Sequence, residues 1–292
     1  MRLPRERFDY SAMVDRAPLA LPDGARIAVW TIVNVEEWEI EGAMPRVVLP
    51  TPAGASVIPD VPNWSWHEYG MRVGFWRLKA ALDRHGIRAT MAVNASVCLS
   101  YPRIAQAALD AGWEFMGHGF KQRALPLEED QRAVIRKSIA TIREFTGKPP
   151  RGWLGPGLAE TWDTPDLLAE AGLEYLCDWV ADEQPYTIKT TSRPLVVVPY
   201  SVELNDIPMM MIQHHESAEL FNRTRDQFDR LYQEGEQSAR IMAIAVHPYI
   251  SGVPHRIKYF EAIYDYMKQK PGVVFWKGED VLDWYRGQVA QG

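Results

Sequence analysis

Short apolar runs rich in β-branched residues alternate along this chain with stretches whose apolar residues recur every three or four positions. Residues 27–33 form the clearest run and predict a buried β-strand. Residues 69–85 follow with apolar side chains at helical spacing, and Gly86 stands where a helix commonly ends. These two segments predict a first strand–helix unit.

The same alternation continues toward the C-terminus. Further strands are predicted at 89–93, 113–116, 152–154, 174–177, 195–198, 208–212, 240–246 and 273–275. Further helices are predicted at 101–111, 127–145, 165–171, 218–234, 256–268 and 279–286. Repeated strand–helix units imply a parallel sheet with right-handed crossovers, and about seven or eight of them imply closure into an α/β barrel.

Two segments interrupt this rhythm. Residues 41–66 contain five prolines and are too long for an ordinary connection, so we expect a functional or assembly loop over the barrel mouth. Its Val57, Ile58, Trp64 and Trp66 are expected to pack on a neighbouring subunit. Residues 182–194 form a second insertion. With no internal repeat or linker, we take the whole chain, 1–292, as one domain with an N-terminal extension at 1–20.

Charge and composition limit the classes of molecule that could bind this protein. A net charge of −6 with no long basic stripe argues against nucleic acid or an anionic membrane surface as a partner, which leaves a small-molecule substrate. Cys98 and Cys177 lie among apolar neighbours without paired spacing, so both are predicted to be reduced core residues. The N-terminus lacks an apolar leader segment, and together these features favour a cytoplasmic protein.

Ionisable side chains follow three of the predicted strands. Glu36 and Glu37 come just after the first strand, His118 after the strand at 113–116, and His247 after the strand at 240–246. Because parallel strands bring their carboxyl ends to one edge of a sheet or barrel, we expect these groups to form a catalytic site. His67 and His85 are instead interpreted as surface or helix-end residues, and the adjacent His214 and His215 as unsuited to hold one metal, because neighbours in a strand point opposite ways.

Several ordered motifs carry a family resemblance. They are Asn34-Val-Glu-Glu37, Gly74-Phe-Trp-Arg-Leu78, Trp113-Glu-Phe-Met-Gly-His-Gly119 and His247-Pro-Tyr-Ile-Ser-Gly252. Over roughly residues 20 to 285 the chain resembles the polysaccharide deacetylase superfamily, most closely the branch with the metal-independent allantoinase, cyclic imide hydrolases and a peptidoglycan deacetylase. The resemblance implies a distorted (β/α)7 barrel, hydrolysis of a non-peptide C–N bond, and a tetramer or dimer.

The metal ligands of the family are incomplete in this chain. The resemblance places Glu36 at the position of the metal carboxylate, Asn34 at that of the general base, His118 at the first histidine and Gln122 at the second. A shifted alignment would instead let Glu36 and Glu37 replace the two aspartates. An amide oxygen is a weak zinc ligand, so no cofactor is expected. If zinc or another divalent metal is bound, Glu36, His118 and Gln122 would hold it.

Each remaining site residue has an expected role. Glu36, or alternatively Glu37, is the predicted general base, and His118 and His247 orient it, stabilise the oxyanion or protonate nitrogen. Substrate contacts are expected from Asn34, Arg151, Trp153, Asn205 and Asp206. Arg151 is assigned by resemblance as the substrate-side arginine, and Trp38 and Trp179, with Trp153, are expected as flat walls of the pocket.

Three functions remain open from the sequence. The first is a hydrolase of a small cyclic amide, imide or ureide that uses general-base water attack without a tightly bound metal. Such rings have activated carbonyls and stabilised leaving groups, so they need no Lewis acid. The second is a metal-dependent deacetylase of an N-acetylated sugar or amide. The third is a degenerate barrel that serves as a ligand-binding or scaffold protein.

Overall fold

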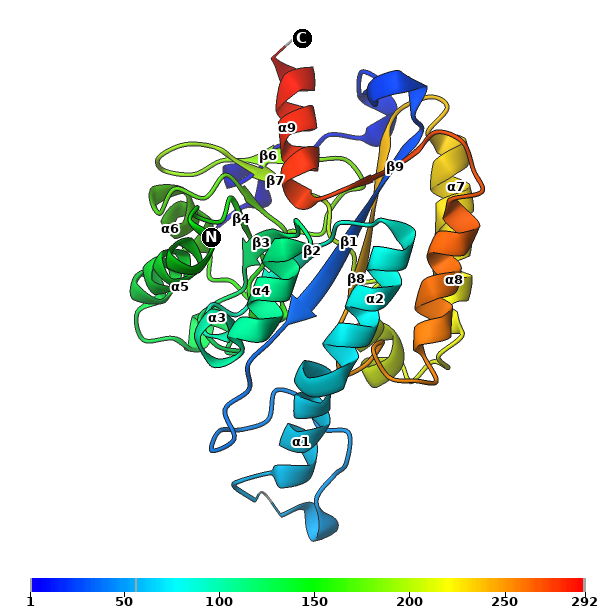
Figure 1. Ribbon diagram of the computed structural model, residues 1–292. Helices are drawn as coiled ribbons and strands as arrows, with labels where there is room; N and C mark the ends of the chain where they lie inside the picture. Colours follow the sequence, from blue (N-terminus) through cyan, green and yellow to red (C-terminus); the bar gives the residue numbers. More distant parts are fainter. Residues whose placement is uncertain (1, 56, 291–292) are drawn as a thin grey trace.

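The computed structural model describes residues 2–55 and 57–290, and its centre is a curved sheet (Figure 1). In the described residues this sheet has nine strands, ordered β6-β7-β5-β4-β3-β2-β1-β8, with β9 also paired to β1. Their bounds are β1 Ile27–Val35, β2 Thr90–Val93, β3 Glu114–Gly117, β4 Gly152–Trp153, β5 Tyr175–Leu176, β6 Tyr186–Ile188, β7 Leu195–Val197, β8 Arg240–Val246 and β9 Val273–Trp276.

Strand β1 is the centre of the sheet. All nine of its residues are buried, as expected for a parallel strand covered on both faces. It pairs in parallel with β8 along Ile27–Val33, while its other edge pairs with β9 near the start and with β2 near the end. This double pairing fixes the direction of β1, so the residues that follow Val35 leave the sheet at its carboxyl edge.

The sheet curls until its two sides nearly meet. The backbone N–H of Ile241 in β8 donates to Glu183 O at 3.2 Å, and that of Ala245 donates to Leu204 O at 2.9 Å. Strands β1 to β5, β7 and β8 all run parallel, whereas β6 runs antiparallel to β7. The expectation of a distorted (β/α)7 barrel is therefore confirmed.

Helices cover the outside of this barrel (Figure 1). Their bounds are α1 Val61–Tyr69, α2 Phe75–His85, α3 Val97–Ser100, α4 Pro102–Asp110, α5 Gln131–Thr146, α6 Thr164–Glu170, α7 Glu219–Glu234, α8 Ile257–Met267 and α9 Gly278–Val289. Gly86 and Gly147 end α2 and α5 with φ of 64° and 81°, the left-handed conformation that glycine adopts most readily. No helix among the described residues combines the length and apolarity needed to cross a membrane.

The predicted strand at 208–212 is wrong. Ile207–Ile212 forms a π-helical turn, with Pro208 in its first turn. A short apolar run does not distinguish strand from helix by periodicity, and this one contains three methionines, which form helices well. Proline is also well suited to the first turn of a helix, where its missing N–H costs nothing.

The Pro-rich segment is less irregular than expected. Helix α1 begins inside it at Val61, and the Asp60 side chain accepts a hydrogen bond from Asn63 N at 3.3 Å. Val57 and Ile58 are exposed, as predicted, but Trp64 and Trp66 pack half-buried against the barrel core. Packing of this segment on a neighbouring subunit stays a prediction.

Helix α1 continues through a π-helical turn, Gly70–Gly74, into α2. This turn lies directly on the loop that follows β8: a Cβ added at Gly74 would come within 2.0 Å of Pro248 O, and one at Gly70 within 2.6 Å of Tyr249 N. Only glycine allows such close backbone approach. The helix therefore supports the loop that carries His247.

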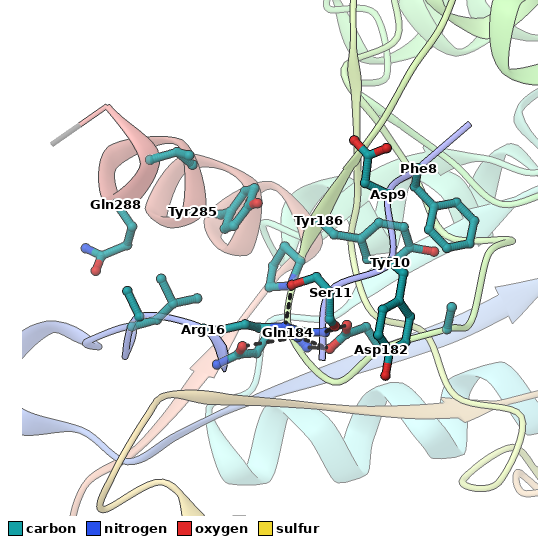
Figure 2. A pocket seen from close by; sticks show the side chains of 15 residues that line it. Phe8, Asp9, Tyr10, Ser11, Arg16, Asp182, Gln184, Tyr186, Tyr285 and Gln288 are labelled. Atoms are coloured by element: carbon teal, nitrogen blue, oxygen red, sulfur yellow. Dashed lines mark hydrogen bonds and ion pairs between the residues drawn. The ribbon is translucent and has the colours of Figure 1, made fainter. Parts of the chain in front are cut away.

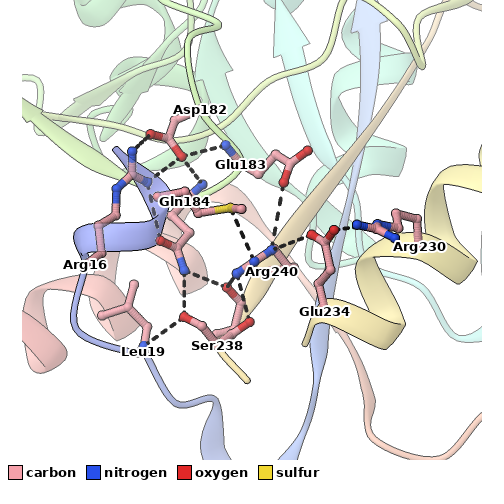
Figure 3. A network of polar contacts seen from close by, with 11 residues as sticks. Arg16, Leu19, Asp182, Glu183, Gln184, Arg230, Glu234, Ser238 and Arg240 are labelled. Carbon is pink, nitrogen blue, oxygen red and sulfur yellow. Dashed lines mark hydrogen bonds and ion pairs between the residues drawn. The ribbon is translucent and has the colours of Figure 1, made fainter. Parts of the chain in front are cut away.

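Polar contacts attach the N-terminal extension to the opposite, amino edge of the barrel (Figure 3). Arg16 forms an ion pair with Asp182 at 2.6 Å, and Gln184 Nε2 donates to Ala239 O at 2.9 Å, just before β8. A cavity of about 430 Å³ lies here between the extension, the 181–186 segment and α9 (Figure 2). It is therefore remote from the strand ends that carry the ionisable groups.

Candidate active site

Glu36, His118 and His247 meet at the carboxyl edge of the barrel. They follow β1, β3 and β8 respectively, and all three side chains are buried. Glu36 Oε1 lies 3.6 Å from His247 Nε2. The negative charge of Glu36 also raises the pKa of His118, against the larger lowering by burial. The three groups therefore share one electrostatic environment. The strand-end pattern has brought together groups that are more than 200 residues apart in sequence.

The two oxygens of Glu36 have different surroundings. Oε2 accepts a hydrogen bond from Trp38 Nε1 at 2.7 Å and a longer one from the Tyr249 hydroxyl at 3.4 Å. Oε1 instead faces His247. The carboxylate is thus held through one oxygen, while the other remains available to a reacting proton.

A stacked pair of rings fixes the backbone beside Glu36. The Trp38 ring stacks on the His67 ring with centroids 4.4 Å apart, and His67 Nε2 lies 3.1 Å from Glu36 O. Burial lowers the pKa of His67 to about 4, so this imidazole is neutral near pH 7 and donates to the carbonyl. His67 was predicted as a surface or helix-end residue: it does lie in the last turn of α1, but it is not on the surface, because it is only 1% exposed.

His247 is oriented by Asp206. Its Nδ1 lies 2.6 Å from Asp206 Oδ1, while Asp206 Oδ2 accepts from the His247 backbone N–H at 2.8 Å and from the Ser251 hydroxyl at 2.6 Å. A carboxylate can only accept here, so the Nδ1 proton points toward Asp206 and Nε2 points toward Glu36. Asp206, predicted to contact substrate, instead contacts the His247 imidazole and is completely buried.

His118 is fixed in a similar manner by a backbone group. Its Nδ1 lies 2.6 Å from Leu154 O, which can only accept, so Nδ1 carries the proton. Burial lowers the pKa of His118, and a neutral ring leaves Nε2 as a hydrogen-bond acceptor. Asn94 donates to His118 O and so anchors the backbone on the other side.

The two asparagines predicted to contact substrate lie in a buried network. Asn34 Nδ2 is 3.4 Å from the Tyr200 hydroxyl and 3.4 Å from Val246 O, and Asn205 Nδ2 donates to the same hydroxyl at 3.1 Å. These contacts link β1, β8 and the segment after β7. They position the floor of the site.

Arg151 is not a substrate contact, and its assignment was wrong. It precedes β4 and therefore lies at the amino edge, where it pairs with Glu174 at 2.7 Å and Asp283 at 2.6 Å. These carboxylates raise the pKa of the guanidinium, as in a structural ion pair. The strand is only two residues long, so the sequence did not show at which end Arg151 lies.

The tryptophan assignments divide in two. Trp153 was predicted as a pocket wall, which is wrong: it is fully buried in the core between the sheet and the helices around α5 and α6. Trp179 lies near the N-terminal extension and donates to Glu160 Oε2 at 2.7 Å, so it too is not beside Glu36. Of these three predicted tryptophans, Trp38 is the one that contacts Glu36.

Glu37 and the paired histidines lie outside the cluster. Glu37 Oε1 accepts from the Ser100 hydroxyl at 3.0 Å, and its N–H donates to Asn94 Oδ1 at 2.8 Å. His214 and His215 are exposed. Of the two alternatives for the general base, the geometry therefore favours Glu36.

A second pair of carboxyl groups, Glu160 and Asp178, is half-buried at the same edge. Asp178 accepts from Gly155 N at 2.8 Å, and Glu160 accepts from Trp179. Burial raises the pKa of Asp178 to about 6, and burial together with the nearby Asp178 charge raises the pKa of Glu160. Such a pair holds a proton at a pH where an unfolded chain has lost it.

This pair makes the stability of the protein pH-dependent. Unfolded carboxyl groups ionise near pH 4, so between about pH 4 and 6 the folded state binds more protons and the free energy of unfolding falls as pH rises. Asp178→Asn should remove the part of this loss that comes from Asp178 and raise the free energy of unfolding at pH 8 by about 2 kcal/mol. Thermal unfolding followed by circular dichroism at pH 4 to 8 measures it, with the exposed Asp163→Asn as a control that changes little. A variant with the wild-type slope would contradict the assignment.

Comparisons with known proteins agree with this architecture. A family model described as polysaccharide deacetylase matches residues 67–176. A Schizosaccharomyces pombe protein named "Putative polysaccharide deacetylase" is 28% identical, covering 86% of this chain and 88% of that protein. A Helicobacter pylori peptidoglycan deacetylase is 22% identical, covering 72% and 83%.

Solved structures extend the agreement to the fold. A probable polysaccharide deacetylase from Pseudomonas aeruginosa has a TM-score of 0.81 at 26% identity and covers 92% of this chain and 93% of its own. The PuuE allantoinase has a TM-score of 0.83 at 24% identity, covering 96% and 98%. The barrel fold and these relatives together indicate that the protein is a hydrolase of non-peptide carbon–nitrogen bonds. The resemblance to the polysaccharide deacetylase superfamily that the sequence motifs indicated is thereby confirmed.

Proposed function

We propose that this protein hydrolyses a small cyclic amide, imide or ureide, with Glu36 as the general base. The observation that carries the proposal is the line of contacts from Asp206 to His247 Nδ1 and from His247 Nε2 to Glu36 Oε1, at 2.6 and 3.6 Å. A buried base beside an oriented imidazole provides both proton transfers that amide hydrolysis requires.

The proton can follow this line of groups. Glu36 Oε1 takes a proton from water as the water oxygen attacks the ring carbonyl, and His118 Nε2 accepts the second hydrogen of that water as a hydrogen bond. The proton passes to His247 Nε2, where Asp206 stabilises the imidazolium, and then to the ring nitrogen as the C–N bond breaks. The products are a carboxylic acid and an amine or amide nitrogen within one opened molecule.

The side chains present do not match a preformed metal site. Among the described residues, no group of three His, Cys, Asp or Glu side chains is arranged to hold an ion. Gln122 Oε1, the expected third ligand, is 3.3 Å from the Asn94 amide nitrogen, which donates to it. A carboxamide oxygen already in a hydrogen bond is a poor replacement for an imidazole ligand. Each proton transfer of the proposed reaction is therefore assigned to a protein side chain.

This leads to a test of metal dependence. Purified protein should contain far less than one tightly bound transition metal per chain, and a chelator should leave its activity intact, because its own side chains move the protons. Elemental analysis and turnover with and without chelator measure this. Stoichiometric zinc, with activity lost to the chelator and restored by zinc, would contradict the proposal and indicate a metal site around Glu36 and His118.

A second candidate function is deacetylation of an N-acetylated sugar or amide. It is favoured by the names of the two curated relatives, both of which are deacetylases. Turnover on a panel of allantoin, hydantoin, succinimide and N-acetylglucosamine oligomers separates the two candidates. Ring opening without acetate release supports the first, and acetate release supports the second.

A further inference from the structure

A large pocket opens beside the proposed catalytic groups. It encloses about 690 Å³ and is lined by three segments, residues 39–46, 120–128 and 156–157, together with part of α5. The first segment begins three residues after Glu36, the second two residues after His118, and the third two residues after Leu154, which accepts from His118. The pocket therefore lies over the same strand ends as the site.

Positive charge dominates this pocket although the chain is acidic as a whole. Four cationic and two anionic side chains line it: Arg46, Lys121, Arg123, Lys137, Glu39 and Glu128. The two carboxylates are engaged, because Glu39 pairs with Lys121 at 2.8 Å and Glu128 lies 3.9 Å from Arg123. Lys137 is exposed and lies over the Phe120 ring.

Arg46 differs from these other cations because it has none of the contacts described for them. It is half-buried, and it forms no ion pair or side-chain hydrogen bond with any residue in the described part of the chain. Its charge also acts on Tyr249, which donates to Glu36: burial and the Glu36 carboxylate raise the pKa of Tyr249, and the Arg46 guanidinium opposes that rise. A half-buried guanidinium without a carboxylate, beside a reactive site, is suited to bind an anionic group.

We propose that Arg46 binds a carboxylate of the substrate in this pocket, so that the preferred substrate is a cyclic amide, imide or ureide that also carries a negative charge. This inference rests on the proposed function, because the reacting ring must lie at Glu36. It assigns to Arg46 the recognition that the sequence had assigned to Arg151. The carboxylate would lie beside the 39–46 segment while the ring carbonyl faces Glu36 and His118.

Equilibrium binding tests the inference without turnover. Succinamate and succinamide are two small amides that differ chiefly in charge, and isothermal titration calorimetry on the full chain at low salt gives both affinities. The wild-type protein should bind succinamate about tenfold more tightly, the size expected for one charge-assisted contact. Arg46→Met should abolish this preference, and Arg46→Lys should retain part of it.

A matched control distinguishes a specific contact with Arg46 from the overall positive electrostatic potential of the pocket. Arg123→Met removes a charge from the same pocket, but one that faces Glu128, so the preference for succinamate should persist. No preference in the wild type, an unchanged preference in Arg46→Met, or an equal loss in Arg123→Met would each overturn the inference. Circular dichroism confirms that each variant is folded before it is scored.

The result is independent of the proposed reaction. If no cyclic amide is hydrolysed but succinamate binding depends on Arg46, the anion site stands and the proposed function fails. If neutral imides are hydrolysed and succinamate has no advantage, the function stands and the anion site fails.

Discussion

Glu36→Gln should lower kcat by about 10² to 10⁴, the range for loss of a positioned base. The amide has nearly the same volume and keeps an oxygen that can accept from Trp38 and Tyr249, so the buried packing should be preserved. Only the proton-accepting charge at Oε1 is lost. Steady-state kinetics on a substrate from the panel measures the effect, and thermal unfolding shows whether the fold is intact.

Glu37→Gln is the matched control. Glu37 is the next residue in the chain, but its carboxylate accepts from Ser100 outside the cluster. We expect near wild-type kcat from this variant. If Glu37→Gln lost activity while Glu36→Gln kept it, the base would be Glu37 and the alternative alignment would be right. If Glu36→Gln instead lowered stability with normal turnover of the folded fraction, its role would be structural.

His247→Asn should also lower kcat by about 10² to 10⁴, with little change in KM, because asparagine cannot hold the proton that the leaving nitrogen requires. Its amide can still donate toward Asp206, so the fold should survive. A large rise in KM with unchanged kcat would contradict the assignment and make His247 a binding residue.

Asp206 acts through His247, so its replacement needs a readout of the imidazole itself. In Asp206→Asn the amide can present a donor to Nδ1, which would favour the wrong tautomer and lower kcat. Nitrogen NMR shifts of His247 should therefore change from a single Nδ1–H tautomer to a mixture. Ser251→Ala removes a different contact to Asp206 and should leave the tautomer as it is.

The sequence predicted the site best where one rule applied. Glu36, His118 and His247 each follow a continuous apolar run, and parallel strands must deliver such residues to one edge. The rule uses only the position of a residue relative to its own strand. It needs no knowledge of the neighbouring strands, which explains why residues so far apart in the chain could be grouped correctly.

The predictions failed for residues whose contact partner, or whose position relative to a strand end, cannot be recognised in the sequence. Asp206 lies in a segment misread as the approach to a strand, and nothing local shows that it faces an imidazole 41 residues later. Arg151 precedes, and Trp153 ends, a strand of two residues, which is too short to show its direction or its faces in the sequence. His67 lies on a helix whose sequence is only weakly amphipathic, so its burial was not evident.

The contact between the π-helical turn and the loop after β8 also bears on how this protein tolerates mutation. Gly74 and Gly252 touch backbone to backbone, with a Cβ on Gly252 only 2.6 Å from the Gly74 Cα, so no layer of side chains separates the helix from the loop. A substitution at either glycine would displace His247 without altering any reacting group. In a random mutagenesis screen, these two positions would behave as if they were part of the active site, although neither carries a functional group.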